Sequence, residues 1–163
     1  QIPIAYTAYN TGKPVKNPND IKYKSAYIDV PNTPEFAFGH GLSYTTFAYT
    51  DLKLNKAVIR QNETIELSFN LTNTGKVVGE EVAQLYLHDP VASTLRPLKE
   101  LIDFQKISLK PGESQILKFV ISADKLSFFN SDLKWVAEPG AFKLMIGSAS
   151  DQIKLNAGIT LTN

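Results

Sequence analysis

The chain has 163 residues, of which 43% are hydrophobic and 20% charged, and its net charge at pH 7 is +1. This composition is typical of a folded globular protein and excludes a largely disordered chain, and the length suits one ordinary domain with an appendage. The small net charge gives no reason to expect nucleic acid as a partner. The absence of cysteine excludes disulfides and thiolate metal sites, and no apolar run approaches the roughly 20 residues that a membrane-spanning helix needs.

Residues 1–35 are predicted to form an irregular arm. They are rich in Pro, Asn and Tyr, and segments 11–14 and 16–20 carry turn-forming residues instead of a periodic apolar pattern. Because a long structureless segment is unusual inside a compact domain, we expect the arm to lie over a body outside this chain. Tyr6 and Tyr9 would then be docking aromatics, and stacking on a sugar is their alternative role. The start at Gln1, without an initiator Met or a signal-peptide pattern, favours a fragment over a processed terminus.

Residues 36–46 form a connector in which two glycines flank His40. Glycine permits backbone angles that other residues resist, so this segment can turn sharply or lie close against other backbone. Its apolar side chains are Phe36, Phe38, Leu42 and Tyr44. We therefore expect a packed hinge instead of a flexible linker.

From Phe47 onward, short strands are predicted by the alternation of apolar and polar residues. In the predicted strand Leu101–Leu109 the apolar phase shifts between Phe104 and Ile107, so a bulge or bend is expected there. The predicted inner positions of the strands are Ile65, Leu67, Phe69, Leu71, Ala83, Leu85, Leu87, Leu117, Phe119, Ile121, Ile153, Leu155, Ala157, Ile159 and Leu161.

The segments between the strands carry turn signals. Residues 110–113 predict a turn, and residues 123–130 one short helical turn with Leu126 and Phe129 pointing inward. Residues 138–140 predict a type II turn, with Gly140 at positive φ. Trp135 shares a strand phase with Leu133, so core packing is favoured for it over a role as a sugar platform. About seven short strands over residues 47–163 predict an all-β fold, a β-sandwich.

No catalytic or metal site is predicted. The only two histidines are separated in the pattern, and no nucleophile elbow, phosphate-binding loop or metal motif is present. His88-Asp89-Pro90 is most simply a strand end that runs into a turn. The carboxylates fall at turns or on predicted solvent faces, where nothing raises their pKa for acid catalysis. The residues considered are Glu80, Glu81, Asp89, Asp103, Glu113 and Glu138.

An ordered set of motifs along essentially the whole chain resembles the C-terminal end of glycoside hydrolase family 3, the β-glucosidase and β-xylosidase family. Each motif is weak alone, and their shared order makes the resemblance strong. The motifs are Ile2-Pro3-Ile4 with residues 10–14, Phe38-Gly39-His40-Gly41-Leu42-Ser43-Tyr44-Thr45, Asn73-Thr74-Gly75, Gln84-Leu85-Tyr86-Leu87, residues 96–101, residues 109–113, residues 138–142 and Ile146-Gly147.

The resemblance implies an anatomy. Residues 1–35 would be the tail of a preceding α/β sandwich domain, residues 36–46 the connector, and residues 47–163 a fibronectin type III-like β-sandwich of the immunoglobulin type. The family's nucleophile and acid/base motifs have no counterpart here, so no catalytic residue, cofactor or metal is carried over. The implied role is a non-catalytic C-terminal domain that braces the catalytic domains of a retaining enzyme.

The resemblance also implies partners. These are the upstream domains of the same polypeptide and, through the parent enzyme, a β-linked oligosaccharide. We expect the chain alone to have a disordered or misdocked arm, or to pair with a second copy, and we expect a periplasmic or secreted location. His40 and Tyr44 would lie nearest the substrate. The expected domain-interface residues are Tyr6, Tyr9, Phe36, Phe38, Leu42, Tyr86 and Arg96, with Tyr86 exposed on the sandwich.

Two other functions remain open from the sequence. A carbohydrate-binding module would tether the enzyme to polysaccharide and would need a planar row of exposed aromatics. A protein-interaction sandwich would act through its loops.

Overall fold

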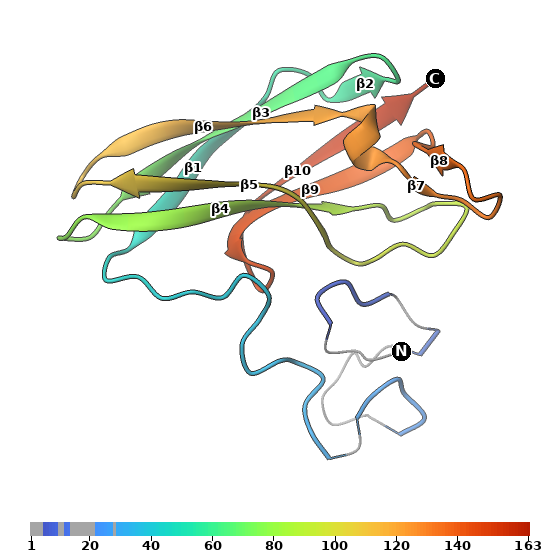
Figure 1. The fold of residues 1–163 in the computed structure, drawn as a ribbon, viewed down its shortest axis with the longest axis horizontal. Helices are drawn as coiled ribbons and strands as arrows, with labels where there is room; N and C mark the ends of the chain where they lie inside the picture. The colour runs from blue at the N-terminus through green and yellow to red at the C-terminus, as the bar shows by residue number, and fades with distance from the viewer. Residues whose placement is uncertain (1–4, 10–11, 14–21, 28) are drawn as a thin grey trace.

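A computed structural model describes residues 5–9, 12–13, 22–27 and 29–163. Two β-sheets pack face to face, and the described residues N-terminal to Phe47 lie beside the outer face of the larger one (Figure 1). The smaller sheet has the order β1 (Phe47–Leu54), β3 (Thr64–Asn73), β6 (Ser114–Ser122). The larger sheet has the order β2 (Val58–Arg60), β10 (Gln152–Thr162), β9 (Gly140–Ala149), β4 (Gly79–His88), β5 (Glu100–Leu109). The predicted all-β sandwich is confirmed.

Strict alternation places the core where the sequence predicts it. On β3, Ile65, Leu67, Phe69 and Leu71 are at most 1% exposed, and they face inner residues of the other sheet. Burying one such side chain stabilises the fold by about 1.5–3 kcal/mol. On β10 the predicted inner residues also alternate with exposed ones, with burial deepest at Ile159 and Leu161, which are 2% and 1% exposed. The core is therefore a continuous apolar layer between the two sheets.

The bulge in β5 lies at Ile102, two residues earlier than predicted. Leu85 pairs with Asp103 and Tyr86 pairs with Leu101, so Ile102 is the extra residue. Ile102 packs against the core, and Phe104 points away from it with 61% of its surface exposed. The prediction of a phase change was correct in kind and wrong in place.

Three predictions for residues 123–140 are corrected. The helical turn forms as η1 (Ala123–Leu126) and buries Leu126, but Phe129 points outward and Phe128 is buried instead. Phe128 and Phe129 form β7 (Phe128–Phe129), which pairs with β8 (Trp135–Val136) in a small hairpin. Trp135 is 53% exposed, so it is not a core residue. The only described glycines with positive φ are Gly39 and Gly112, so Gly140 does not occupy a type II turn as predicted.

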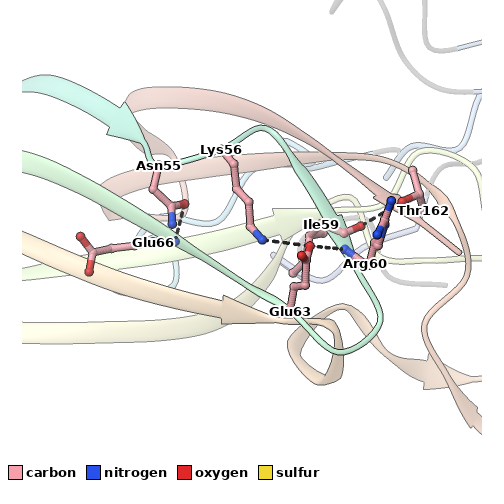
Figure 2. Close-up of polar contacts among 7 residues, drawn as sticks. All are labelled: Asn55, Lys56, Ile59, Arg60, Glu63, Glu66 and Thr162. Atoms are coloured by element: carbon pink, nitrogen blue, oxygen red, sulfur yellow. Dashed lines mark hydrogen bonds and ion pairs between the residues drawn. The ribbon is translucent and has the colours of Figure 1, made fainter.

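β2 was not predicted, and it closes one end of the sandwich by parallel pairing with the last residues of β10. Polar contacts fix this end (Figure 2). Glu63 accepts a hydrogen bond from the backbone N–H of Arg60 at 3.0 Å and forms an ion pair with Lys56 at 2.9 Å. These two contacts lower the pKa of the Glu63 carboxyl. The side chain of Asn55 accepts a bond from the N–H of Glu66 at 2.9 Å, which ties β1 to the start of β3.

Candidate functional site

The connector is fixed to the outer face of the larger sheet through Gln84 on β4. The Gln84 amide donates to the carbonyls of Ser148 and Gly39, at 2.6 and 3.3 Å, and its Oε1 accepts a bond from the Tyr86 hydroxyl. Gly39 has φ +81, and a Cβ there would meet the Gln84 amide at 2.2 Å. The positive φ and this close approach both favour glycine at position 39.

Tyr86 is fully buried, which corrects the expectation that it is exposed. Tyr6 of the arm approaches its ring edge-on with ring centroids 6.2 Å apart, and Tyr6 also stacks on Phe38 at 4.0 Å. Burial is the main cause that raises the pKa of Tyr86 to about 12, with Tyr6 and Asp151 contributing. Tyr6 of the arm therefore contacts Tyr86, a residue that was expected to contact another domain.

Two predicted interface residues of the connector, Phe36 and Leu42, have no such cover and are 69% and 93% exposed. Tyr44, which was predicted to lie near the substrate, is 101% exposed. Phe38 is stacked on Tyr6 and still 44% exposed. These four residues are here called the connector row.

The exposed His40 is held by its backbone N–H, which donates to the carbonyl of Ala37 at 2.9 Å, and its ring lies 5.1 Å from that of Phe36. Together with Leu42, Glu80 and Glu81 it lines an open cleft of about 440 Å³. Tyr44 does not line this cleft, so the structure does not bring the two predicted substrate-proximal residues into one pocket.

The end of the connector is anchored by the buried Asn73, which the sequence marks only as part of a family motif. Asn73 is fully buried, accepts a bond from the Thr45 hydroxyl at 2.6 Å, and donates to the carbonyls of Val77 and Leu109 at 2.9 Å each. Its backbone also bonds with Gly112 and Glu113 of the predicted 110–113 turn. Asn73 therefore joins the connector to two turns. The Asn73-Thr74-Gly75 motif alone does not indicate that this side chain is buried.

Two carboxylates are less solvated than predicted. Glu81 accepts a hydrogen bond from the Tyr49 hydroxyl at 2.7 Å, and burial raises the pKa of this carboxyl. Asp89 is only 6% exposed, and burial raises its pKa as well. The prediction that nothing raises the pKa of these carboxylates is thus wrong at both positions. The two residues do not form a catalytic pair, because they line different clefts.

The loop between β4 and β5 places Asp89 and Arg96 in one cleft of about 580 Å³. The Arg96 guanidinium lies 4.5 Å from the centre of the Phe128 ring and pairs with Glu100 at 2.8 Å. The arm reaches the same loop, since the Leu98 N–H donates to the Ala8 carbonyl at 2.9 Å and Tyr9 forms an isolated β-bridge with Pro97. Tyr9 and Arg96, both predicted interface residues, therefore lie at one loop.

Other site types are not found among the described residues. No group of three or more His, Cys, Asp or Glu residues there could hold a metal ion. None of the helices in the described part of the chain is long and apolar enough to cross a membrane. The motif residues 2–4 and the turns predicted around Pro14 and Pro18 lie outside the described residues.

Comparison with known proteins gives concordant matches. A family model described as a fibronectin type III-like domain matches residues 81–150. A periplasmic β-glucosidase from Salmonella typhimurium is 44% identical over 154 residues, which are 94% of this chain and 20% of that protein. A β-xylosidase from Formosa agariphila is 43% identical over 92% of this chain and 20% of that protein. The crystal structure of a β-glucosidase from Listeria innocua in complex with glucose matches with a TM-score of 0.91 and 32% identity, over 99% of this chain and 22% of that chain.

The matches agree with the motif order seen in the sequence. They cover nearly all of this chain, whereas the chain spans about a fifth of the length of the curated relatives that it matches. The fibronectin type III-like match lies within the two-sheet sandwich that the structure describes. The chain therefore belongs to glycoside hydrolase family 3, the β-glucosidases and β-xylosidases, as a C-terminal region that carries their fibronectin type III-like domain.

Proposed function

We propose that this chain is a non-catalytic accessory domain that braces the catalytic domains of a retaining β-glucosidase-like enzyme. The observation that carries the proposal is the connector row, in which Leu42 and Tyr44 are 93% and 101% exposed. Exposed apolar groups gathered in one place mark a surface that another body covers. An interface between domains of one chain typically covers about 600–1,500 Å².

The division of the chain supports a connection to an upstream body. Residues 1–35 are the tail of that body, residues 36–46 the connector, and residues 47–163 the sandwich. The bond from Gln84 to the Gly39 carbonyl, at 3.3 Å, fixes the connector to the sandwich on one side. Leu42 and Tyr44 in the same segment remain exposed, so the connector row transmits the position of the sandwich to the catalytic domains.

The chemistry belongs to the longer protein. We infer a β-linked oligosaccharide as its substrate, because the relatives are named β-glucosidases and β-xylosidases. His40 and Tyr44 are the residues of this chain nearest to that substrate. The name of the Salmonella relative supports a periplasmic or secreted location. In the chain alone, the uncovered connector row pairs with a second copy at high concentration.

A tethering role on polysaccharide has weaker support. Flat binding to a glucan chain needs aromatic rings in one plane, and the most prominent exposed pair, Phe129 and Trp135, is tilted by 59°. Binding through the loops has one supporting feature, the cleft beside Arg96, which is considered below.

The proposal is tested by replacing Phe36 and Leu42 together with serine in the full-length protein. Loss of the interface should lower the melting temperature and reduce kcat/KM about ten-fold, because loosened catalytic groups are misplaced. The matched control replaces Ile116 and Val120 with serine, since these are also exposed apolar residues but lie on the smaller sheet. Unchanged activity and melting temperature in the connector variant would exclude a bracing role.

A further inference from the structure

Two complementary polar atoms on the β4–β5 loop have no hydrogen-bond partner among the described residues. They are the Asp89 Oδ2, an acceptor, and the Arg96 Nε, a donor, and both atoms are buried. Leaving such a group unpaired is costly, and most buried polar groups in proteins are hydrogen-bonded. An unpaired acceptor and an unpaired donor in one cleft indicate a bound group that donates a hydrogen bond to Asp89 and accepts one from Arg96.

Several polar atoms around this pair are already engaged. Asp89 Oδ1 accepts a bond from the Val91 N–H at 3.3 Å, and Arg96 uses a terminal nitrogen for Glu100 at 2.8 Å. Glu138 is turned to Ser93, whose N–H donates to it at 2.9 Å. Both residues line the cleft, but their unpaired atoms lie beneath its surface, so a bound group reaches them where the side chains of the loop move aside.

A main-chain peptide group fits this pair. Its N–H donates to the Asp89 carboxylate and its carbonyl accepts from the Arg96 guanidinium, and both bonds are of the stronger, charge-assisted kind. The rim of the cleft is apolar, with Val91 and Leu95 exposed by 80% and 65%, which suits a polypeptide surface. A metal ion is disfavoured, because Arg96 would place a positive charge beside it.

The chain already shows that backbone from the N-terminal side reaches this loop. The Ala8 carbonyl accepts a bond from the Leu98 N–H at 2.9 Å, and Tyr9 bridges to Pro97. The arm therefore occupies one side of the loop, directly next to Arg96. A preceding domain that is connected through the arm would therefore lie close to this cleft.

We propose that the cleft formed by residues 88–96 and Leu98 captures a main-chain peptide group of the domain that precedes this chain, held between Asp89 and Arg96. This inference rests on the proposed bracing function and adds a polar anchor to the apolar connector row. The two contacts lie on different parts of the molecule, so each can fail without the other.

The first test compares hydrogen exchange of loop amides 91–96 in the full-length protein and in the 163-residue chain alone. A captured peptide group should slow exchange of this loop at least ten-fold in the full-length protein. Equal exchange rates in both would overturn the proposal. The same experiment reads the amides of residues 36–46, so slowed exchange in the connector without any change in the loop would contradict this inference and leave the bracing function supported.

The second test uses Asp89→Asn, which keeps the Oδ1 that bonds to Val91 and replaces the open acceptor with a donor. In the full-length protein this change should speed exchange of the loop and lower the melting temperature. In the chain alone it should raise the melting temperature, because an unpaired buried charge is removed. Asp132→Asn makes the same chemical change at an exposed position and should do neither. A rise of the melting temperature in both proteins, or a full-length structure with only a water between Asp89 and Arg96, would refute the peptide-capture site.

Discussion

Asp89 illustrates how one buried carboxylate can lower the stability of the isolated chain. Its carboxylate is 6% exposed, and one oxygen has no partner among the described residues. Burial and the charge of Glu138 raise its pKa, against the opposing effects of the Val91 N–H, Arg96 and His88. The folded state therefore disfavours the ionised form, and the fold loses stability as the pH rises through the folded pKa of this group.

A pH series on the chain alone should reveal this cost. At pH 7 we expect Asp89→Asn to unfold at a higher temperature than the wild type, by the equivalent of about 1 kcal/mol. The difference should shrink as the pH falls below the folded pKa, because the wild-type carboxyl is then protonated and neutral. Thermal unfolding of both proteins between pH 3 and pH 8 measures it. A difference that stays constant over this range would show that the charge is not the cause.

Single residues divide clearly into those whose position the sequence predicts and those whose position it does not. Ile65 and Leu67 are correctly placed in the core, because a strand turns alternate side chains to opposite faces. Asp89 and Trp135 were misplaced, since their burial depends on loops and a hairpin that meet them from elsewhere in the chain. The Trp135 indole donates a hydrogen bond to Asp124 at 3.0 Å instead of packing inward. This contact depends on the tertiary structure and cannot be predicted from the strand pattern.

At the scale of elements, the connector depends on Gly39. We expect Gly39→Ala to lower the free energy of unfolding by about 1–3 kcal/mol, because the residue has φ +81 and the new methyl group would meet a hydrogen-bonded Gln84. Chemical denaturation of the chain measures the effect.

Gly41→Ala is the matched control for that prediction. A Cβ at Gly41 has open space around it, and Gly41 is not among the described glycines at positive φ. This variant should therefore be nearly neutral. Equal effects of the two substitutions would mean that the Gln84 contact does not fix the connector.

The elements with long, regular alternation, such as β3 and β10, were predicted well. The phase change in β5 was predicted at Phe104 to Ile107, two residues after its true place at Ile102. The sequence shows that the side chains turn over, but not which residue the partner strand leaves unpaired. β2 was missed altogether. Its three residues are too few for a periodic pattern, and only its pairing with β10 makes it a strand.

For the whole molecule, residues 6–9 of the arm contact the sandwich. Tyr6 approaches the fully buried Tyr86 from the arm side. Tyr6→Ala should therefore admit water and remove one cause of the raised pKa of Tyr86, so that this pKa falls from about 12 toward 10. Spectrophotometric titration of the tyrosines measures the change. Tyr23→Ala, at a residue 79% exposed on the same arm, should leave the Tyr86 titration unaltered.

The overall architecture was accessible from the sequence, because turn residues recur between the strands and the family motifs follow one another in order. The relation of the arm to the sandwich was not. Tyr86 alternates with core residues and so was assigned to an exposed face, and nothing in the local pattern connects it with Tyr6, 80 positions earlier. Contacts between such distant segments are visible only in the three-dimensional structure.

The bulge at Ile102 has a consequence for how the molecule behaves in a crowded solution. β5 is a border strand of the larger sheet, and an uninterrupted border strand is a template on which other chains can polymerise. The extra residue breaks the regular row of backbone donors and acceptors, and Lys106 and Asp103 add charges that are paired within the molecule, to Glu80 and Lys125. Removing Ile102 would restore a continuous border and favour fibrous aggregates over a dispersed protein.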